Sequence, residues 1–361
     1  MEYRTKSVFG RYAEQLQVLI DTNIEKFKEP FFPKYFGMGS PQMGLTYATV
    51  IGRARIEAAA SVVAHGSEAP LRSRAGLEKL SGEIAALKVK RKMDEADYRD
   101  YLTMQALNVS DEAKKSQILQ LIWNDVKYAV DSVTARLDIM VAQALSTGII
   151  PINTTTNPDG VIPGNIDLLV PAAHKETGTA AFSWTLTGRR WDNAASATPI
   201  TDVTTLTQNL WNNEGIVHGK MLMTPTMWWS VQKSAEVVSV FSGAPTLDNF
   251  NSMMQSLKLP IVELVNVRAR VESDGVLSSV STWNSDNMVS FVPEGQLGTI
   301  HNALSVEQIS PVSGVDYAVS SNILVSKWAQ TEPFGEFTRG EIAAFPGLEI
   351  ADTIHIVNVQ R

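Results

Sequence analysis

Histidines are the side chains in this sequence most suited to binding a metal ion or moving a proton near neutral pH. There are five of them: His65, His174, His218, His301 and His355. A helix places two ligands on one face when they lie three or four positions apart, and no two of these histidines have that spacing. The chain contains no cysteine, which excludes disulfides and thiolate metal sites. A helical metal site is therefore unsupported, and we expect neither a metal nor a cofactor.

Short motifs of catalytic families are equally weak. Ser230 and Lys233 fit an S-x-x-K pattern, but four-residue matches occur by chance and the partner motifs are missing. The run at 37–44, GMGSPQMG, follows no expected strand and misplaces the third glycine of a dinucleotide fingerprint, so we expect a flexible loop. Asn108 and Asn153 begin glycosylation sequons, which matter only in a secreted protein. We therefore predict no catalytic residue, no cofactor-binding residue and no enzyme activity.

Composition indicates a globular chain with a sizeable core. Of its 361 residues, 44% are hydrophobic and 19% are charged, which is not the composition of a disordered chain. The formal net charge of -7 argues against a protein that binds nucleic acid by electrostatic attraction. The N-terminus lacks the apolar region of a secretory signal, and no apolar run approaches the ~18 residues of a membrane span. We expect a soluble intracellular product.

The other elements must be arranged around a long helix that the sequence predicts over 110–148. Ser110 is a suitable N-cap, Gly148 stands where a left-handed C-cap is needed, and Pro151 follows. Apolar residues recur at helical spacing between these ends, and at about 1.5 Å per residue the helix would form a rod of roughly 55 Å. Two alternatives are a kinked core helix and a coiled-coil arm. The apolar residues repeat with the 3.6-residue period of a straight helix better than with a strict heptad, which disfavours the coiled coil.

Two features precede this helix. A short amphipathic helix is predicted from Tyr12 to Phe27, followed by an aromatic cluster that we interpret as an anchor onto the core: Phe31, Phe32, Tyr35 and Phe36. Alternating segments on either side of a turn-rich, charged stretch then predict a projecting hairpin at 53–93. An isolated hairpin is marginal in water, so it needs a neighbour, which could be another copy of the chain. We interpret the basic run at 88–92 as a solvated edge. The two less favoured alternatives are a nucleic-acid contact and a charged contact between subunits.

The predicted elements after residue 93 alternate between helices and strands. A short helix is expected at 94–108, and strands and loops at 149–195, where Trp184 and Trp191 would pack as core or interface aromatics. Helices should begin at Thr201 or Asp202, at Thr224-Pro225 and at Thr246. Residues 261–310 are β-rich, and the apolar runs of 311–361 should rejoin the domain of the long helix, which makes the second domain an insertion.

This order of elements resembles the HK97-type fold of tailed-phage major capsid proteins, and specific stretches are similar to the lambda E-like family. RLDIMVAQALSTG at 136–148 resembles the end of that family's spine helix, although Asp138 stands where glutamate is expected. LMTPTMWWSV at 222–231 resembles a strand and helix start of its axial domain. Three further stretches resemble its β segment, the turn before its last strands and its closing strand: 281–298 with Trp283, Asp286 and Pro293, 328–340, and 351–359.

The resemblance implies an α+β fold with a structural function. It implies an N-terminal arm, an extended E-loop hairpin, a peripheral domain that contains the spine helix, an inserted α/β axial domain and a return to the peripheral domain. The corresponding ranges are 1–52, 53–93, 94–195 with the spine helix at 110–148, 196–310, and 311–361.

Copies of the chain would form hexamers and pentamers of an icosahedral virion capsid, assembled in the host cytoplasm. The capsid would enclose double-stranded DNA without sequence-specific binding, and it would not involve a membrane. Portal, scaffold and decoration proteins are the further partners implied. The projecting hairpin and the arm would bury apolar area on neighbouring subunits.

Three rival functions remain open at this stage. An encapsulin-type nanocompartment shell shares the fold and would differ in holding an enzyme as cargo. Another phage structural protein, such as a tail component, would also be structural. An enzyme with an α/β domain and a helical arm would remain monomeric in solution.

Overall fold

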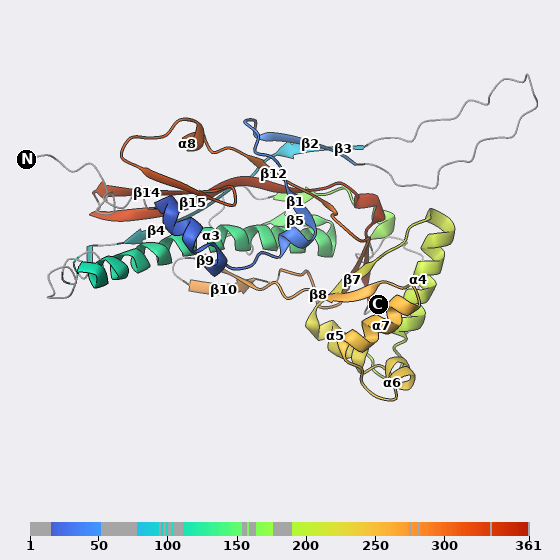
Figure 1. Ribbon diagram of the computed structural model, residues 1–361. Coiled ribbons are helices and arrows are strands. Elements are labelled where there is room, and N and C mark those ends of the chain that lie inside the picture. The colour runs from blue at the N-terminus through green and yellow to red at the C-terminus, as the bar shows by residue number, and fades with distance from the viewer. Residues whose placement is uncertain are drawn as a thin grey trace, which may run out of the picture.

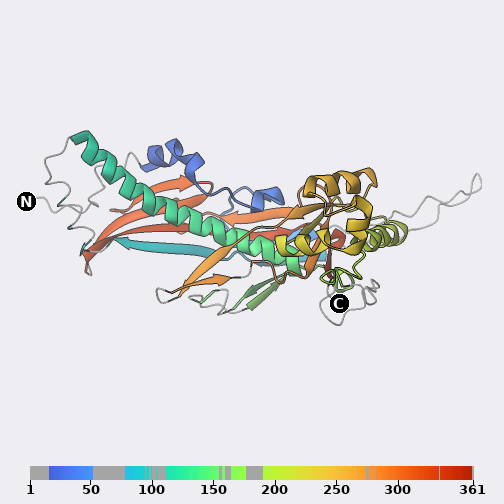
Figure 2. The same ribbon diagram turned by 90° about the horizontal axis from the view of Figure 1, so that it is seen from below.

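The computed structural model describes an elongated chain with two lobes (Figures 1 and 2). The described residues are 16–51, 78–93, 95, 96, 99, 103, 111–153, 157, 158, 164–175, 190–273, 276–280, 282–332 and 334–359. The long lobe consists of helix α3 and a six-stranded sheet, and the helical lobe gathers α4 to α7 around a four-stranded sheet at one end of the molecule. No described helix has the length and apolar character needed to cross a membrane.

The predicted long helix is a single helix, α3 (Asp111–Thr147), which runs along the long lobe (Figure 2). It ends as expected at Gly148, whose φ of 69° is left-handed and whose N–H donates to the carbonyl of Ala144 at 2.8 Å. Ser110, the predicted N-cap, lies outside the described residues. The helix is continuous, and its apolar side chains from Val126 to Leu145 face one core, so the alternative of a broken helix is wrong.

Helix α3 packs against the six-stranded sheet, with β15 as its main partner. Gly340 of β15 makes this close approach possible, since a Cβ there would lie 2.7 Å from the carbonyl oxygen of Ala129. Strand order is β1-β12-β15-β14-β13, and β4 also pairs with β15. The strands are β1 (Phe36–Met38), β4 (Ala86–Met93), β12 (Gly298–Ala303), β13 (Asp316–Ser320), β14 (Ile323–Thr331) and β15 (Phe334–Leu348).

Two segments of the long lobe differ from their prediction. The run at 37–44 is not a free loop, because β1 pairs in parallel with β12 and Gln42 bridges to Ala303. Of the residues at 83–93, only Glu83 belongs to the second strand of the hairpin. That strand is β3 (Glu78–Glu83), which pairs with β2 (Thr46–Ile51), whereas β4 pairs with β15. Alternation identified β4 as a strand but could not reveal that its partner lies about 250 residues away in the chain.

The helical lobe has its own apolar core between its sheet and its helices. Strand order is β16-β11-β7-β8, with β7 and β8 parallel. Its strands are β7 (Lys220–Met223), β8 (Ile261–Leu264), β11 (Met288–Val292) and β16 (His355–Asn358), and its helices are α4 (Pro199–Glu214), α5 (Pro225–Gln232), α6 (Ala235–Phe241) and α7 (Leu247–Ser256).

Helix starts in this lobe follow the sequence closely. Thr224 and Thr246 cap α5 and α7, since each hydroxyl accepts a backbone N–H three residues on. The N-cap of helix α4 is Thr198, three or four residues before the predicted caps Thr201 and Asp202, and Asp202 instead accepts a hydrogen bond from the indole of Trp191 at 3.0 Å. The early start follows from proline at the first helical position.

The lobes do not divide the chain as simple consecutive blocks. Strand β12 lies within 196–310 but belongs to the long lobe, and β16 lies within 311–361 but belongs to the helical lobe. The remaining elements in the described part of the chain are α1 (Leu16–Thr22), α8 (Val306–Ile309), β5 (Ile149–Ile152) with β6 (Gly164–Asp167), β9 (Ala269–Ser273) with β10 (Val276–Val280), and 3-10 turns at Ile24–Lys26, Phe32–Lys34, Ala172–His174 and Ala351–Thr353. The short helix expected at 94–108 falls mostly outside the described residues.

Candidate functional site: surfaces for subunit assembly

The N-terminal segment, defined as residues 24–40, lies across α3 and is fastened to it by a buried carboxylate. Oδ1 of Asp138 accepts the backbone N–H groups of Phe31 at 2.8 Å and of Phe32 at 3.0 Å. Burial raises the pKa of Asp138, and these two N–H groups and the charge of Lys28 oppose the rise. The aromatic cluster serves as the predicted anchor, since Phe32, Tyr35 and Phe36 are buried in the core of the long lobe.

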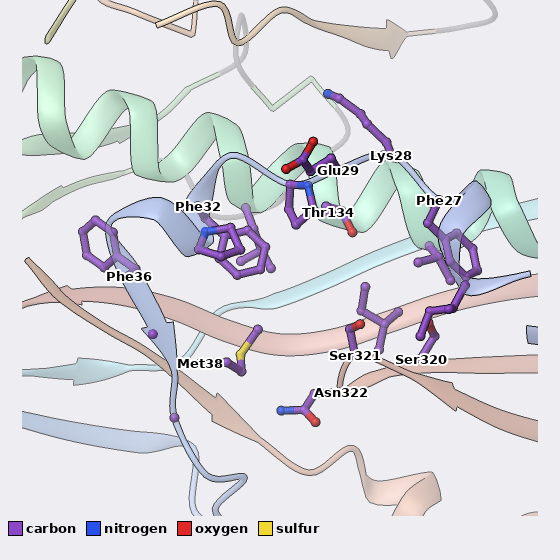
Figure 3. A pocket seen from close by; sticks show the side chains of 18 of the residues that line it. Phe27, Lys28, Glu29, Phe32, Phe36, Met38, Thr134, Ser320, Ser321 and Asn322 are labelled. Carbon is purple, nitrogen blue, oxygen red and sulfur yellow. The ribbon is translucent and has the colours of Figure 1, made fainter. Parts of the chain in front are cut away.

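Beneath this segment is a cavity of about 980 Å³ (Figure 3). Aromatic side chains of the N-terminal segment lie on one side, and Ser320, Ser321 and Asn322 of the β13–β14 turn lie on the other, with Thr134 of α3 between them. Ser321 and Asn322 both have positive φ, as a tight turn between antiparallel strands requires. The lining is mostly apolar, and the titratable residues in it, Glu25, Lys28 and Glu29, all belong to the N-terminal segment, which favours packing over chemistry.

The ribbon formed by β2 and β3 is fixed at its base. Tyr47 stacks on Phe345 and His301 at ring-centroid distances of 4.8 and 5.2 Å, and the N–H of Ile84 donates to the carbonyl of Leu45. Among the described residues, the two strands of the ribbon pair with one another and with no other strand. The ribbon lies beside β12 without joining the main sheet (Figure 1), and such a two-stranded unit is marginal in water without a further surface.

An ion-pair cluster joins the N-terminal segment to the helical lobe. Glu263 of β8 lies 2.7 Å from Lys220 and 3.7 Å from Lys34, and the ring of Tyr35 lies beneath Lys220. Burial alone would raise the pKa of Glu263, but Lys220, Tyr35 and Lys34 outweigh it and lower the pKa. The carboxylate therefore stays ionised at neutral pH and couples the two lobes electrostatically.

The helical lobe exposes large apolar side chains. Trp211 of α4 and Trp229 of α5 are 60% and 57% exposed, and four further side chains of this lobe are also exposed: Val217, Val238, Val240 and Leu257. Tryptophan is costly to leave in water and is enriched where proteins meet. This lobe is therefore a candidate surface for contact with other copies of the chain.

The structure brings together three histidines that the rule of three- or four-residue spacing on a helix could not connect. His174, His218 and His355 meet at the boundary between the lobes, with rings of His174 and His355 stacked at 4.1 Å between centroids. Burial lowers the pKa of His218 to about 4. The rule missed this cluster because it considers only ligands on a single helix. His301 lies apart under Tyr47, and His65 lies outside the described residues.

The S-x-x-K motif has no catalytic arrangement. The hydroxyl of Ser230 donates to the carbonyl of Thr226 one turn earlier in α5, and Lys233 is exposed at the end of that helix. Asn108 of the first sequon and Trp184 lie outside the described residues, whereas Trp191 is buried in the core of the helical lobe, as predicted.

The sequence profile of the phage major capsid protein E family matches residues 24–358. The chain belongs to this family. It is a capsid protein and forms the shell of a phage head. The match begins in the N-terminal segment and ends in β16, so it includes both lobes and the ribbon. The family is structural, and the capsid protein is accordingly a component of the virion.

Solved structures agree with this fold. The capsid protein of a prophage of Escherichia coli CFT073 is 14% identical with a TM-score of 0.54, over 96% of this chain and 98% of that one. A phage-related protein from Bordetella bronchiseptica RB50 is 12% identical with a TM-score of 0.50, over 95% and 96%. No curated protein matches the sequence. The predicted HK97-type capsid fold and capsid function are thus confirmed.

Proposed function

We propose that copies of this capsid protein assemble into hexameric and pentameric capsomers of an icosahedral head that encloses double-stranded DNA, in the host cytoplasm. Portal, scaffold and decoration proteins would be its further partners. In this proposal the ribbon at 46–83 is the E-loop, the long lobe is the peripheral domain, and the helical lobe, including β16, is the axial domain around the capsomer axis. These limits differ from the predicted ranges, 53–93 for the E-loop and 196–310 for the axial domain, because they follow the strand pairing.

The observation that carries the proposal is the ribbon. Its base is anchored on Phe345, yet among the described residues its strands gain no third strand. Burying apolar area on a neighbouring subunit contributes about 25 cal/mol per Å². A standard interface of roughly 800 Å² per partner therefore supplies the stabilisation that the ribbon does not obtain from its own subunit. Repeated at every subunit, such contacts hold a shell by shape fit.

The charge of the chain supports enclosure of DNA without tight binding. The formal net charge is -7, and phosphate binding depends on lysine and arginine. The basic run in β4 is directed to its own chain, since Lys88 lies 3.0 Å from Glu341 and Arg91 lies 3.3 Å from Asp125. These pairs favour the solvated-edge interpretation over a nucleic-acid contact.

Shortening the ribbon tests the proposal. Ile51 and Glu78 are opposite one another in register, so an Asn-Gly turn can replace residues 52–77 and close the hairpin. The shortened chain should keep the circular-dichroism spectrum and melting temperature of the unassembled protein, while closed particles in negative-stain microscopy are lost.

A control variant uses a side chain outside both the ribbon and the helical lobe. Gln120→Ser changes an exposed polar residue of α3 and should leave assembly intact. Closed particles formed equally well by the shortened chain would contradict the role of the ribbon. A wild-type chain that stays monomeric under all assembly conditions would contradict the proposed function itself.

A further inference from the structure

Three side chains with metal-binding atoms meet at the boundary of the two lobes. His174 ends a 3-10 turn, Glu214 is the last residue of α4, and His355 begins β16. One ligand atom from each lies within 4.8 Å of the others. The three residues are far apart in sequence, so the fold itself, and not a local turn, assembles the group.

We propose that His174, Glu214 and His355 form a binding site for a divalent transition-metal ion of the zinc class. Zinc is bound by imidazole nitrogen and carboxylate oxygen at about 2.0–2.2 Å in a tetrahedron, whose ligand atoms are then about 3.4 Å apart. Nε2 of His174 and Oε2 of Glu214 are 3.4 Å apart. The donor set of two imidazoles and one carboxylate excludes calcium and magnesium, which prefer oxygen ligands.

A third histidine orients one of these ligands. Nε2 of His218 lies 3.1 Å from Nδ1 of His355 and would accept the Nδ1–H of His355 once Nε2 of His355 binds the ion. Nε2 of His218 then carries no proton and no longer donates to the carbonyl oxygen of Thr353, 3.0 Å away. A metal-bound imidazole is commonly held at its other nitrogen by a hydrogen-bonding partner, which fixes the ring. His218 is the positioning residue for His355 and is not itself a ligand in this proposal.

The site has a route from solvent on one side. The side chain of Glu214 is 38% exposed and that of His174 is 11% exposed, whereas His355 is fully buried. An ion can therefore approach past Glu214, while His355 closes the inner side.

A bound ion would join three segments of the fold. It would link the connector at 164–175, the end of α4 and the last strand of the helical lobe. Lys175 already pairs with Ile356 through an isolated parallel bridge at this point. An ion that binds the folded chain but not the unfolded one stabilises the fold in proportion to the logarithm of its concentration.

Zinc titration of the chelator-treated full-length chain tests the site. We expect one equivalent bound by isothermal titration calorimetry and a rise in melting temperature that a chelator reverses. Glu214→Gln, which preserves shape at a partly exposed position, should weaken zinc binding at least ten-fold, and His174→Ala should weaken it further. The control His301→Ala changes a histidine outside the cluster and should bind zinc as the wild type does.

Cobalt provides a readout independent of affinity. Substitution of Co²⁺ should give the visible absorption of a four-coordinate ion with nitrogen ligands, and Glu214→Gln should change that spectrum. The proposal is overturned if the folded wild-type chain binds no zinc, or if Glu214→Gln binds zinc with unchanged affinity and spectrum. Because the measurements use the unassembled chain, failure here leaves the proposed shell function standing.

Discussion

Asp138→Ala should detach the N-terminal segment from α3. The carboxylate accepts two backbone N–H groups, from Phe31 and Phe32, and Asp138 is only 1% exposed. Alanine would leave both donors without this acceptor. Each buried donor left unsatisfied costs about 1–3 kcal/mol, so we expect the variant to lose about 2–6 kcal/mol of unfolding free energy.

Asp138→Asn should be much milder. The pKa of Asp138 is raised in the folded chain, so the fold favours the protonated carboxyl, whose carbonyl oxygen still accepts hydrogen bonds. Asparagine resembles that neutral form. The stabilisation from a raised carboxyl pKa is present at low pH and is lost as the pH rises through the folded value. Lowering the pH through the folded pKa of Asp138 should therefore stabilise the wild type relative to Asp138→Asn.

Denaturant unfolding and hydrogen exchange measure these effects. Urea titration of the unassembled chain gives the free-energy difference, and exchange followed by mass spectrometry reports on residues 24–40. Asp138→Ala should speed exchange in this segment, whereas the control Asp248→Asn, at an exposed carboxylate in the first turn of α7, should leave that exchange unchanged and change stability by less than about 1 kcal/mol. Wild-type stability together with unchanged exchange in Asp138→Ala would refute the anchoring role.

Two further substitutions test the packing within and between the lobes. Gly340→Ala should lower the unfolding free energy by about 1–3 kcal/mol because its Cβ would meet the carbonyl of Ala129, whereas Gly44→Ala, with open space around it, should be neutral by thermal melting. Glu263→Gln should cost about 1–2 kcal/mol at pH 7 through loss of its pair with Lys220. The pKa of Glu263 is lowered, so this contribution is present above its unfolded value and is lost as the pH falls through the folded value, and urea titrations across that range should show the wild type converging on the variant.

Local signals in the sequence were sufficient to predict where individual helices begin and end. Helical periodicity and Gly148 predicted the extent of α3 to within a residue, and proline after Thr224 predicted the start of α5. These features depend on neighbours a few positions away, for which periodicity and capping rules are reliable. The ordered set of such stretches was enough to indicate the capsid family.

Pairings between distant segments were beyond these rules. Alternation in β4 is the same whether its partner is β3 or β15, and the apolar run in β16 does not say which sheet it joins. The histidine cluster was missed for the same reason, because His218 and His355 are separated by 137 residues. Such contacts depend on the whole topology, which local patterns in one sequence do not determine.

Electron cryo-microscopy of particles assembled from the full-length chain tests the central claim most directly. We expect closed shells in which the ribbon at 46–83 lies on a neighbouring subunit and the helical lobes, with Trp211 and Trp229, meet around the capsomer axis. A shell in which the ribbon contacts only its own subunit, or a chain that remains monomeric, would contradict this account.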